Sequence, residues 1–148
     1  MKLGWEILPG KLYQRGLFGP APVEAKVAAL REGNVGAMAV LVRKPDPEVA
    51  AWLEAEGGVY VYRPISDGKN VEVGFLEMLA CEMAQVIRGG KAVITQCRAG
   101  RNRSGLLSAL IIRELEGVSG AEALAHVQRI RPNALYNPHF CEYLRSLP

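Results

Sequence analysis

The segment of the sequence best suited to carry out chemistry runs from Thr95 to Gly105 and contains one cysteine and three arginines. A short apolar run precedes it and a helical pattern follows it. In such a strand-loop-helix unit, backbone N–H groups and the positive end of the helix dipole converge on one anion. Cys97 begins the loop, where the same donors stabilise a thiolate. The segment therefore predicts an anion-binding loop with a nucleophilic cysteine.

The loop also supplies the groups that a bound phosphate requires. Gly100 can adopt the backbone angles that turn successive N–H groups inward. Arg103 begins the helix, where its guanidinium can form paired hydrogen bonds to two phosphate oxygens. Ser104 follows it, and its hydroxyl can donate to sulfur when a thiolate leaves in a second, hydrolytic step. We expect the substrate phosphate to contact the loop residues Arg98, Ala99, Gly100, Arg101, Asn102 and Arg103.

The order of these residues, Cys97-x5-Arg103-Ser104, resembles the signature loop of the cysteine-dependent protein phosphatases, specifically their dual-specificity branch. Residues 7–13 are similar to the opening hairpin of that family, and residues 131–140 to its closing segment. The resemblance implies one catalytic domain over residues 1–148 and phosphoric monoester hydrolysis through a phosphocysteine intermediate, with no cofactor and no metal. A Walker A nucleotide loop is excluded, because no Gly-Lys-Ser/Thr is present.

The resemblance also requires a general acid upstream of the loop, which protonates the leaving oxygen. Asp67 fits this role, since it lies thirty residues before Cys97 in a glycine-containing loop, and the only other aspartate is Asp46. Under the alternative interpretation, Asp67 caps the following helix or completes the Ser-Asp-Gly turn.

One position departs from the family pattern. The family usually has histidine directly before the nucleophile, and this chain has Gln96. Glutamine can hydrogen-bond the loop backbone, but it carries no positive charge. Two interpretations follow: an enzyme with a less activated Cys97, or a phosphate-binding pseudophosphatase.

The class of substrate is open within the phosphatase interpretation. With 148 residues there is little room for loops that deepen a tyrosine-only pocket, which favours a dual-specificity site for phosphorylated proteins. Arg98 and Arg101 resemble the paired basic residues of the family's lipid-phosphatase branch. A phosphoinositide or another multiply anionic phosphate is therefore the alternative substrate. The two arginines could also be solvated loop charges.

The length, composition and charge of the chain limit the classes of protein to which it can belong. A chain of 148 residues with 49% hydrophobic and 22% charged residues is typical of one globular domain. A net charge of +3 is too mild to indicate nucleic-acid binding. There is no apolar run of about 18 residues and no secretion signal, so we expect no integral membrane segment and a cytoplasmic protein. His126 and His139 are too few and too distant to suggest a metal site.

The other cysteines carry weaker signals. Three widely spaced cysteines disfavour a disulfide scaffold. Cys81 falls in a helical pattern and is expected to be a small core residue. Its reversible pairing with Cys97 after oxidation, known in some members of the family, is the lesser alternative. Cys141 gives no functional signal.

The alternation of strand and helix patterns predicts an α/β fold, with a mainly parallel central sheet flanked by helices, as in the phosphotyrosine phosphatases. We expect the helix after the loop to be the central buried helix, because its apolar residues occur nearly all round. The predicted elements are an edge hairpin within residues 5–14, strands at 37–42, 59–62 and 92–95, and helices within 23–33 and 47–57 and at 71–88, 104–116, 120–130 and 138–147.

Overall fold

The elements follow one another in the predicted order in the computed structural model, which describes residues 1–148. There are five strands and six helices. The strands are β1 (Trp5–Leu8), β2 (Leu12–Arg15), β3 (Val35–Val40), β4 (Val59–Tyr62) and β5 (Ala92–Gln96). The helices are α1 (Val23–Glu32), α2 (Pro47–Ala55), α3 (Val73–Arg88), α4 (Arg103–Glu116), α5 (Gly120–Ile130) and α6 (Pro138–Arg145).

The strands form one sheet in the order β1-β2-β5-β3-β4. The pairs β2–β5, β5–β3 and β3–β4 are parallel. β1 pairs antiparallel with β2 as the predicted hairpin. The sheet is therefore mixed, with an antiparallel edge on a parallel body. β5 lies between two parallel partners and all its residues are buried, which explains its uninterrupted apolar start.

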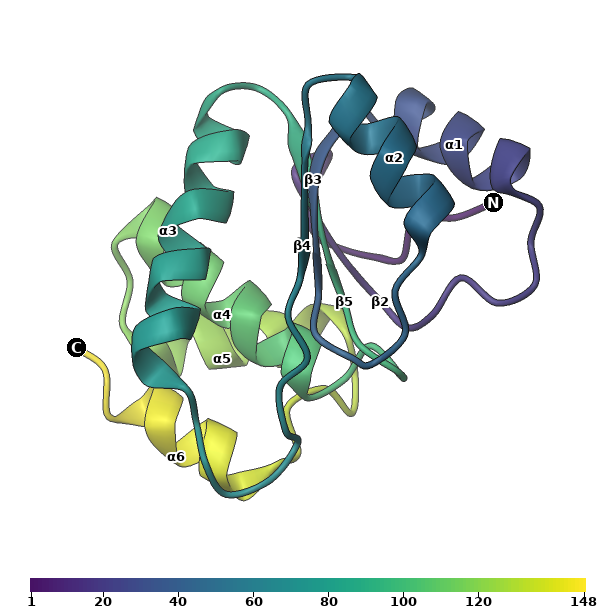
Figure 1. The fold of residues 1–148 in the computed structure, drawn as a ribbon. Coiled ribbons are helices and arrows are strands. Elements are labelled where there is room, and N and C mark those ends of the chain that lie inside the picture. The colour runs from purple at the N-terminus through teal and green to yellow at the C-terminus, as the bar shows by residue number, and fades with distance from the viewer.

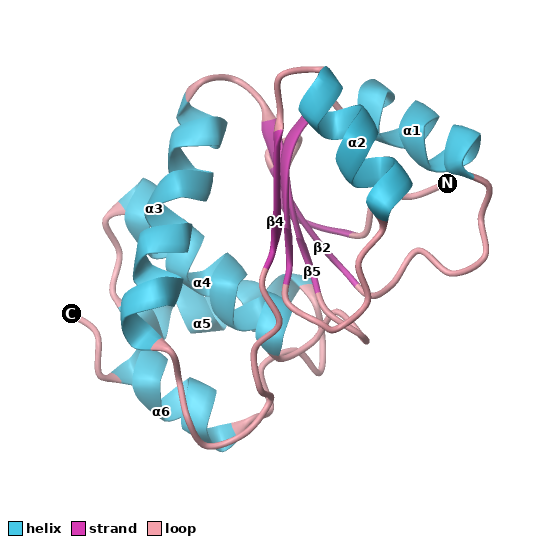
Figure 2. Cartoon of the chain, viewed as in Figure 1, coloured by secondary structure: helices cyan, strands magenta, loops and turns pink.

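Helices cover both faces of the sheet (Figures 1 and 2). α1 and α2 lie on one face, and α3 to α6 form a larger layer on the other. α4 crosses the middle of that layer, and every residue from Ser104 to Ile112 is buried, as predicted for the helix after the loop. No helix has both the length and the apolar character needed to span a bilayer.

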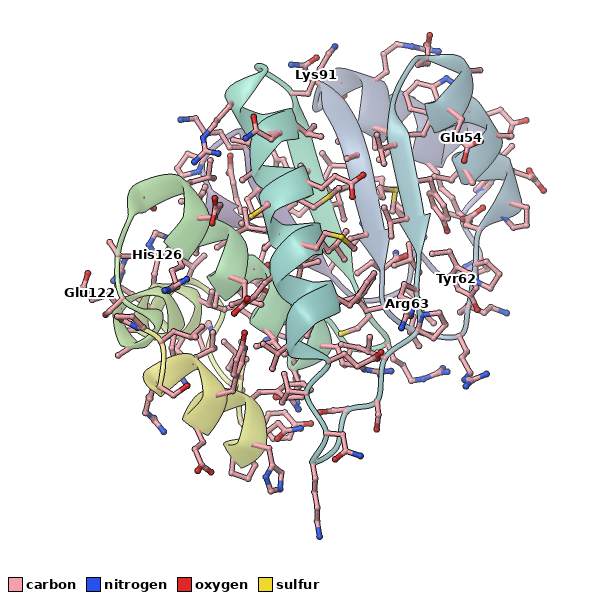
Figure 3. The ribbon with its side chains drawn as sticks, turned by 60° about the vertical axis from the view of Figure 1, so that its left-hand side comes forward. Glu54, Tyr62, Arg63, Lys91, Glu122 and His126 are labelled. Carbon is pink, nitrogen blue, oxygen red and sulfur yellow. The ribbon has the colours of Figure 1, made fainter.

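The carboxyl ends of the parallel strands define one edge of the sheet. In Figure 3, Lys91, directly before β5, lies at the opposite end of the sheet from Tyr62 and Arg63, where β4 ends. The loops after β4 and β5 therefore meet at the same edge. Ligands in open α/β sheets bind at this edge.

Several predicted boundaries are shifted. The strand expected at 37–42 is Val35–Val40. Leu41, directly after it, still donates from its N–H to the Gln96 carbonyl at 2.8 Å, and Leu41 and Val42 stay buried. The helix expected from 71 begins at Val73, after a turn in which the Val73 N–H donates to the Val71 carbonyl. The last helix ends at Arg145 rather than 147.

Cys81 does not lie in the core, contrary to the prediction. It is exposed on α3, where desolvation and then the neighbouring Glu114 carboxylate raise the pKa of its thiol. Glu114 lies ten residues after Ser104 in α4, about 15 Å along the helix axis, and Ser104 contacts Cys97. Cys81 is therefore too far from Cys97 to form a disulfide in this fold.

Candidate active site

The loop of residues 97–102 connects β5 to α4, and neighbouring segments hold it by its carbonyl groups. The Leu17 N–H donates to the Arg98 carbonyl at 3.2 Å. The side chain of Gln14, which is fully buried in β2, donates from Nε2 to the Gly100 carbonyl at 3.0 Å. These donors fix the loop backbone at Arg98 and at Gly100.

A third donor comes from the segment before α6. The Leu135 N–H donates to the Arg101 carbonyl at 3.3 Å. In a trans peptide the N–H points away from the C=O of the same unit, so outward carbonyls turn the following N–H groups toward the inside of the loop. Apart from the bridge between Gly16 and Ala99, no backbone N–H from residues 98 to 102 donates to another backbone carbonyl. The loop therefore presents unpaired amides at the start of α4, as an anion-binding loop requires.

Gly100 is the one position in this loop that excludes a side chain. Its φ is +70°, and a Cβ there would lie 2.5 Å from the carbonyl carbon of Arg15 and 2.6 Å from the backbone nitrogen of Gly16. The loop is thus packed against the end of β2. The positive φ agrees with the special backbone conformation predicted for Gly100, and the close approach to β2 is a second reason for glycine that the sequence did not indicate.

The predicted nucleophile and its serine partner are in contact. The Sγ of Cys97 lies 3.1 Å from the Oγ of Ser104, and both residues are buried. The guanidinium of Arg103 lies between this loop and the loop after β4, where Nη1 donates weakly to the Ile65 carbonyl at 3.4 Å. Its Nε is buried and has no hydrogen-bond partner. Arg103 thus has donor capacity available for an anion.

The structure brings Asp67 to the loop. One carboxylate oxygen accepts from Nδ2 of Asn102 at 3.2 Å, and the other accepts from Nδ2 of Asn137 at 2.8 Å. Asp67 does not cap the following helix, because Glu72 occupies that position. No backbone N–H donates to its carboxylate, so the alternative turn role has no hydrogen bond to support it.

Gln96 makes the expected backbone contact, although not to the anion loop itself. Its Nε2 donates to the Gly16 carbonyl at 3.1 Å. Gly16 forms an isolated antiparallel bridge with Ala99. Gln96 therefore holds the segment that lines the loop, and it contributes no positive charge near Cys97.

Gln96→His is expected to shift the pH dependence of Cys97 alkylation to lower pH, because a protonated imidazole next to the loop would stabilise the thiolate. Iodoacetamide labelling between pH 4 and pH 9, followed by mass spectrometry, measures this shift. An unchanged labelling profile would show that the loop amides and the helix end already determine the reactivity.

Among the predicted substrate-binding residues, the side chains of Arg98 and Arg101 are exposed at the loop. The structure adds Arg131 to them. Its guanidinium stacks on Trp5 at 4.8 Å and its Nε is buried without a partner. Desolvation and then the charge of Arg101 lower the pKa of Arg131, whereas Cys97 raises it. Arg131 is therefore a third basic residue near the loop.

The two histidines have no place in the site. Nε2 of His126, on α5, lies 2.8 Å from the Ile7 carbonyl, and Figure 3 shows it far from Arg63 at the site edge. His139 is exposed in the first turn of α6. No three His, Cys, Asp or Glu side chains converge as a metal site would require.

Solved structures provide the comparison with known proteins. The chain superposes on Tk-PTP in its active form with a TM-score of 0.72 and 26% identity, covering 92% of this chain and 88% of that one. Human DUSP28 gives a TM-score of 0.71 and 24% identity, over 94% and 88% of the two chains. The PTP-2 phosphatase of Cydia pomonella gives 0.75 and 24%, over 94% and 86%.

These neighbours are dual-specificity and tyrosine phosphatases, and the chain has their fold. The fold class implied by the signature loop is thereby confirmed. No protein-family model matches the sequence, and no curated protein matches it. The roles of the individual residues rest on the geometry described above.

Proposed function

We propose that residues 1–148 form a catalytic domain that hydrolyses phosphoric monoesters on phosphorylated proteins through a phosphocysteine intermediate. Cys97 is the nucleophile, Arg103 binds the phosphate, Asp67 is the general acid and Ser104 donates to the sulfur. The observation that carries the proposal has two parts. The Nε of Arg103, at the start of α4, is buried and has no hydrogen-bond partner. The buried thiol of Cys97, at the start of the loop before α4, contacts the buried Ser104 hydroxyl. The phosphatase neighbours support the same class of reaction.

In the first step, the Cys97 thiolate attacks the phosphorus. The S–P bond forms, the bond from phosphorus to the leaving oxygen breaks, and Asp67 transfers its proton to that oxygen. The loop amides and the Arg103 guanidinium stabilise the charge on the three remaining phosphate oxygens. The products are the dephosphorylated alcohol or phenol and a phosphocysteine.

In the second step, water attacks the phosphocysteine. The Asp67 carboxylate accepts a proton from this water while the new P–O bond forms and the S–P bond breaks. The sulfur leaves as a thiolate, which accepts a hydrogen bond from the Ser104 hydroxyl at the 3.1 Å contact. Inorganic phosphate leaves and the site returns to its initial state.

Turnover of an aryl phosphate in the presence of a chelator tests this proposal against the pseudophosphatase interpretation. We expect stoichiometric release of inorganic phosphate over many turnovers. Saturable binding of phosphate or vanadate with no turnover would identify a phosphate-binding module instead.

A second candidate substrate class, a phosphoinositide or another multiply anionic phosphate, is favoured by one observation. Arg131 lies near enough to Arg101 for their charges to interact. With Arg98, three guanidiniums outside the Arg103 position surround one loop. One phosphate does not require all of them, because Arg103 and the amides already supply donors for its oxygens.

Replacing both Arg98 and Arg101 by alanine is expected to raise KM for multiply anionic substrates about three- to tenfold, because exposed ion pairs contribute on the order of 0.2–1 kcal/mol each. The salt dependence of KM should become flatter. A small aryl phosphate should be hydrolysed almost as before. Equal losses on both kinds of substrate would assign the two arginines to the shape of the loop.

A further inference from the structure

Asp67 lies on a loop that the backbone alone does not fix. The loop of residues 63–72 connects β4 to α3 (Figure 1). Its first part is held to β3, since the Arg63 and Ile65 N–H groups donate to the Val40 and Leu41 carbonyls. From residue 66 to residue 70, no backbone N–H donates to a backbone carbonyl. Side chains from elsewhere must therefore position the carboxylate.

Asn137 is one of these side chains, and both ends of its amide are used. Oδ1 accepts from the His139 N–H at 2.9 Å and from the Phe140 N–H at 3.3 Å, so Asn137 is the N-cap of α6. Nδ2 donates to Asp67 at 2.8 Å and to the Gly68 carbonyl at 3.2 Å. The cap fixes the amide plane, and the fixed amide directs its donors at the acid loop.

Asn102 is the other side chain, and it comes from the anion loop. Its Oδ1 accepts from the Tyr136 N–H at 2.9 Å and from the Asn137 N–H at 3.0 Å. Its Nδ2 donates to the second carboxylate oxygen of Asp67. Asn102 and Asn137 are both more than nine-tenths buried. The two amides thus hold one oxygen each, from two sides of the carboxylate.

We propose that Asn137 and Asn102 form an amide clamp that positions Asp67 for proton transfer. The inference rests on the proposed function, because it assigns a role to the acid of that reaction. Both amides remain compatible with the acidic form, since a protonated carboxyl keeps acceptor capacity on its oxygens while its O–H donates to the leaving group. The clamp also connects the acid to the anion loop through Asn102 and to the N-terminus of α6 through Asn137.

Asn137→Ser removes the amide donor to Asp67 and keeps a side-chain oxygen at the N-cap of α6. Serine is a good N-cap, but its side chain is too short to reach Asp67 from this position. We expect kcat/KM for phosphotyrosine or an alkyl phosphate to fall by about 10²-fold, the loss that a misplacement of about 1 Å causes. The kcat/KM of dinitrophenyl phosphate should fall by less than about threefold, because it reports the first step, and the leaving oxygen of this substrate needs no proton there.

Asn102→Asp is the second variant. It keeps the acceptor oxygen for the Tyr136 and Asn137 N–H groups and replaces the donor to Asp67 by a carboxylate oxygen. The new carboxylate in the anion loop should weaken phosphate binding for every substrate, and we expect a further loss in kcat/KM on poor leaving groups only. Ser119→Ala is the matched control, because it removes the cap contact of Ser119 Oγ to the Glu122 N–H in α5 and touches neither Asp67 nor the loop. It should lower the Tm while leaving the ratio of the two activities unchanged.

The decisive comparison is made in an Asp67→Asn background. If the clamp acts through Asp67, adding Asn137→Ser there should cause no further selective loss on poor leaving groups. Two results would overturn the clamp: equal losses on good and poor leaving groups in both single variants, or an undiminished selective loss in the double variant. In either case, a parent protein that still hydrolyses phosphate esters would leave the proposed function standing. A parent with no turnover would overturn the proposed function and the clamp together.

Discussion

Replacing Cys97 by serine is expected to lower kcat by at least about 10³-fold, as the loss of an enzyme nucleophile does. The serine hydroxyl does not ionise near neutral pH, so the attacking group is lost. Binding should survive, because the unpaired loop amides and the guanidinium of Arg103 are unchanged. Phosphate release measures the loss in kcat, and titration with a phosphotyrosyl peptide measures the retained affinity.

Cys81→Ser is the control for this prediction. Cys81 is exposed on α3 and far from the loop, so its replacement should leave kcat and KM unchanged. Turnover of Cys97→Ser within tenfold of the parent would remove Cys97 from the mechanism. A loss in Cys81→Ser comparable to that in Cys97→Ser would indicate that cysteine replacement acts through the fold.

Asp67→Asn is expected to slow hydrolysis of phosphotyrosine and alkyl phosphates by about 10²–10⁴-fold, the range that a general acid contributes. The kcat/KM of activated aryl phosphates should be affected far less, because it reports the first step and their leaving oxygens need little protonation. The asparagine amide keeps the size of the carboxyl group and one of its two contacts, because its oxygen accepts from only one of the Asn102 and Asn137 amides and its Nδ2 cannot accept from the other. Steady-state rates with phosphotyrosine, an alkyl phosphate and dinitrophenyl phosphate measure this dependence on the leaving group.

Asp46→Asn is the matched control, because Asp46 is the only other aspartate and lies at the N-cap of α2. Asparagine also caps helices well, so this variant should preserve the dependence of rate on the leaving group. Equal losses across leaving groups in Asp67→Asn would indicate a structural role for Asp67 in its loop.

The anion loop was predictable from sequence because its constraints are local. A strand, a glycine with positive φ and a helix N-terminus occur within eleven residues in the segment from Thr95 to Gly105, and each of them has a signal in the local sequence. The contact between Cys97 and Ser104 follows from their places at the two ends of the loop.

The supports of the loop were not predictable, because they come from distant segments. The Gln14 contact to Gly100 spans 86 positions, and the Asn137 contact to Asp67 spans 70. A lone glutamine in a strand and an asparagine before a proline carry no signal of such partners. Leu135 is a further example: its φ of +55° is rare for a large side chain, so no local rule predicts that its N–H donates to the loop.

Cys81 shows why helical patterns alone do not decide burial. The apolar residues Leu76, Leu79, Ala80 and Met83 do form the inner face of α3. Cys81 follows Ala80 directly but projects from the outer face, because one helical step turns the side chain by about 100°. The prediction that Cys81 is a core residue was wrong because its neighbour Ala80, and not Cys81 itself, lies on the inner face.

The most direct test of the phosphocysteine proposal is the mass of the protein during turnover. Acid quenching of the Asp67→Asn variant in the presence of dinitrophenyl phosphate should trap the intermediate, because this leaving group needs no proton in the first step while loss of the base slows hydrolysis of the phosphocysteine. We predict that intact-protein mass spectrometry detects one added PO3 group, that peptide mapping assigns it to Cys97, and that Cys97→Ser shows no addition. Turnover by the parent with no phosphorylated Cys97 in any quenched sample would contradict the proposed mechanism.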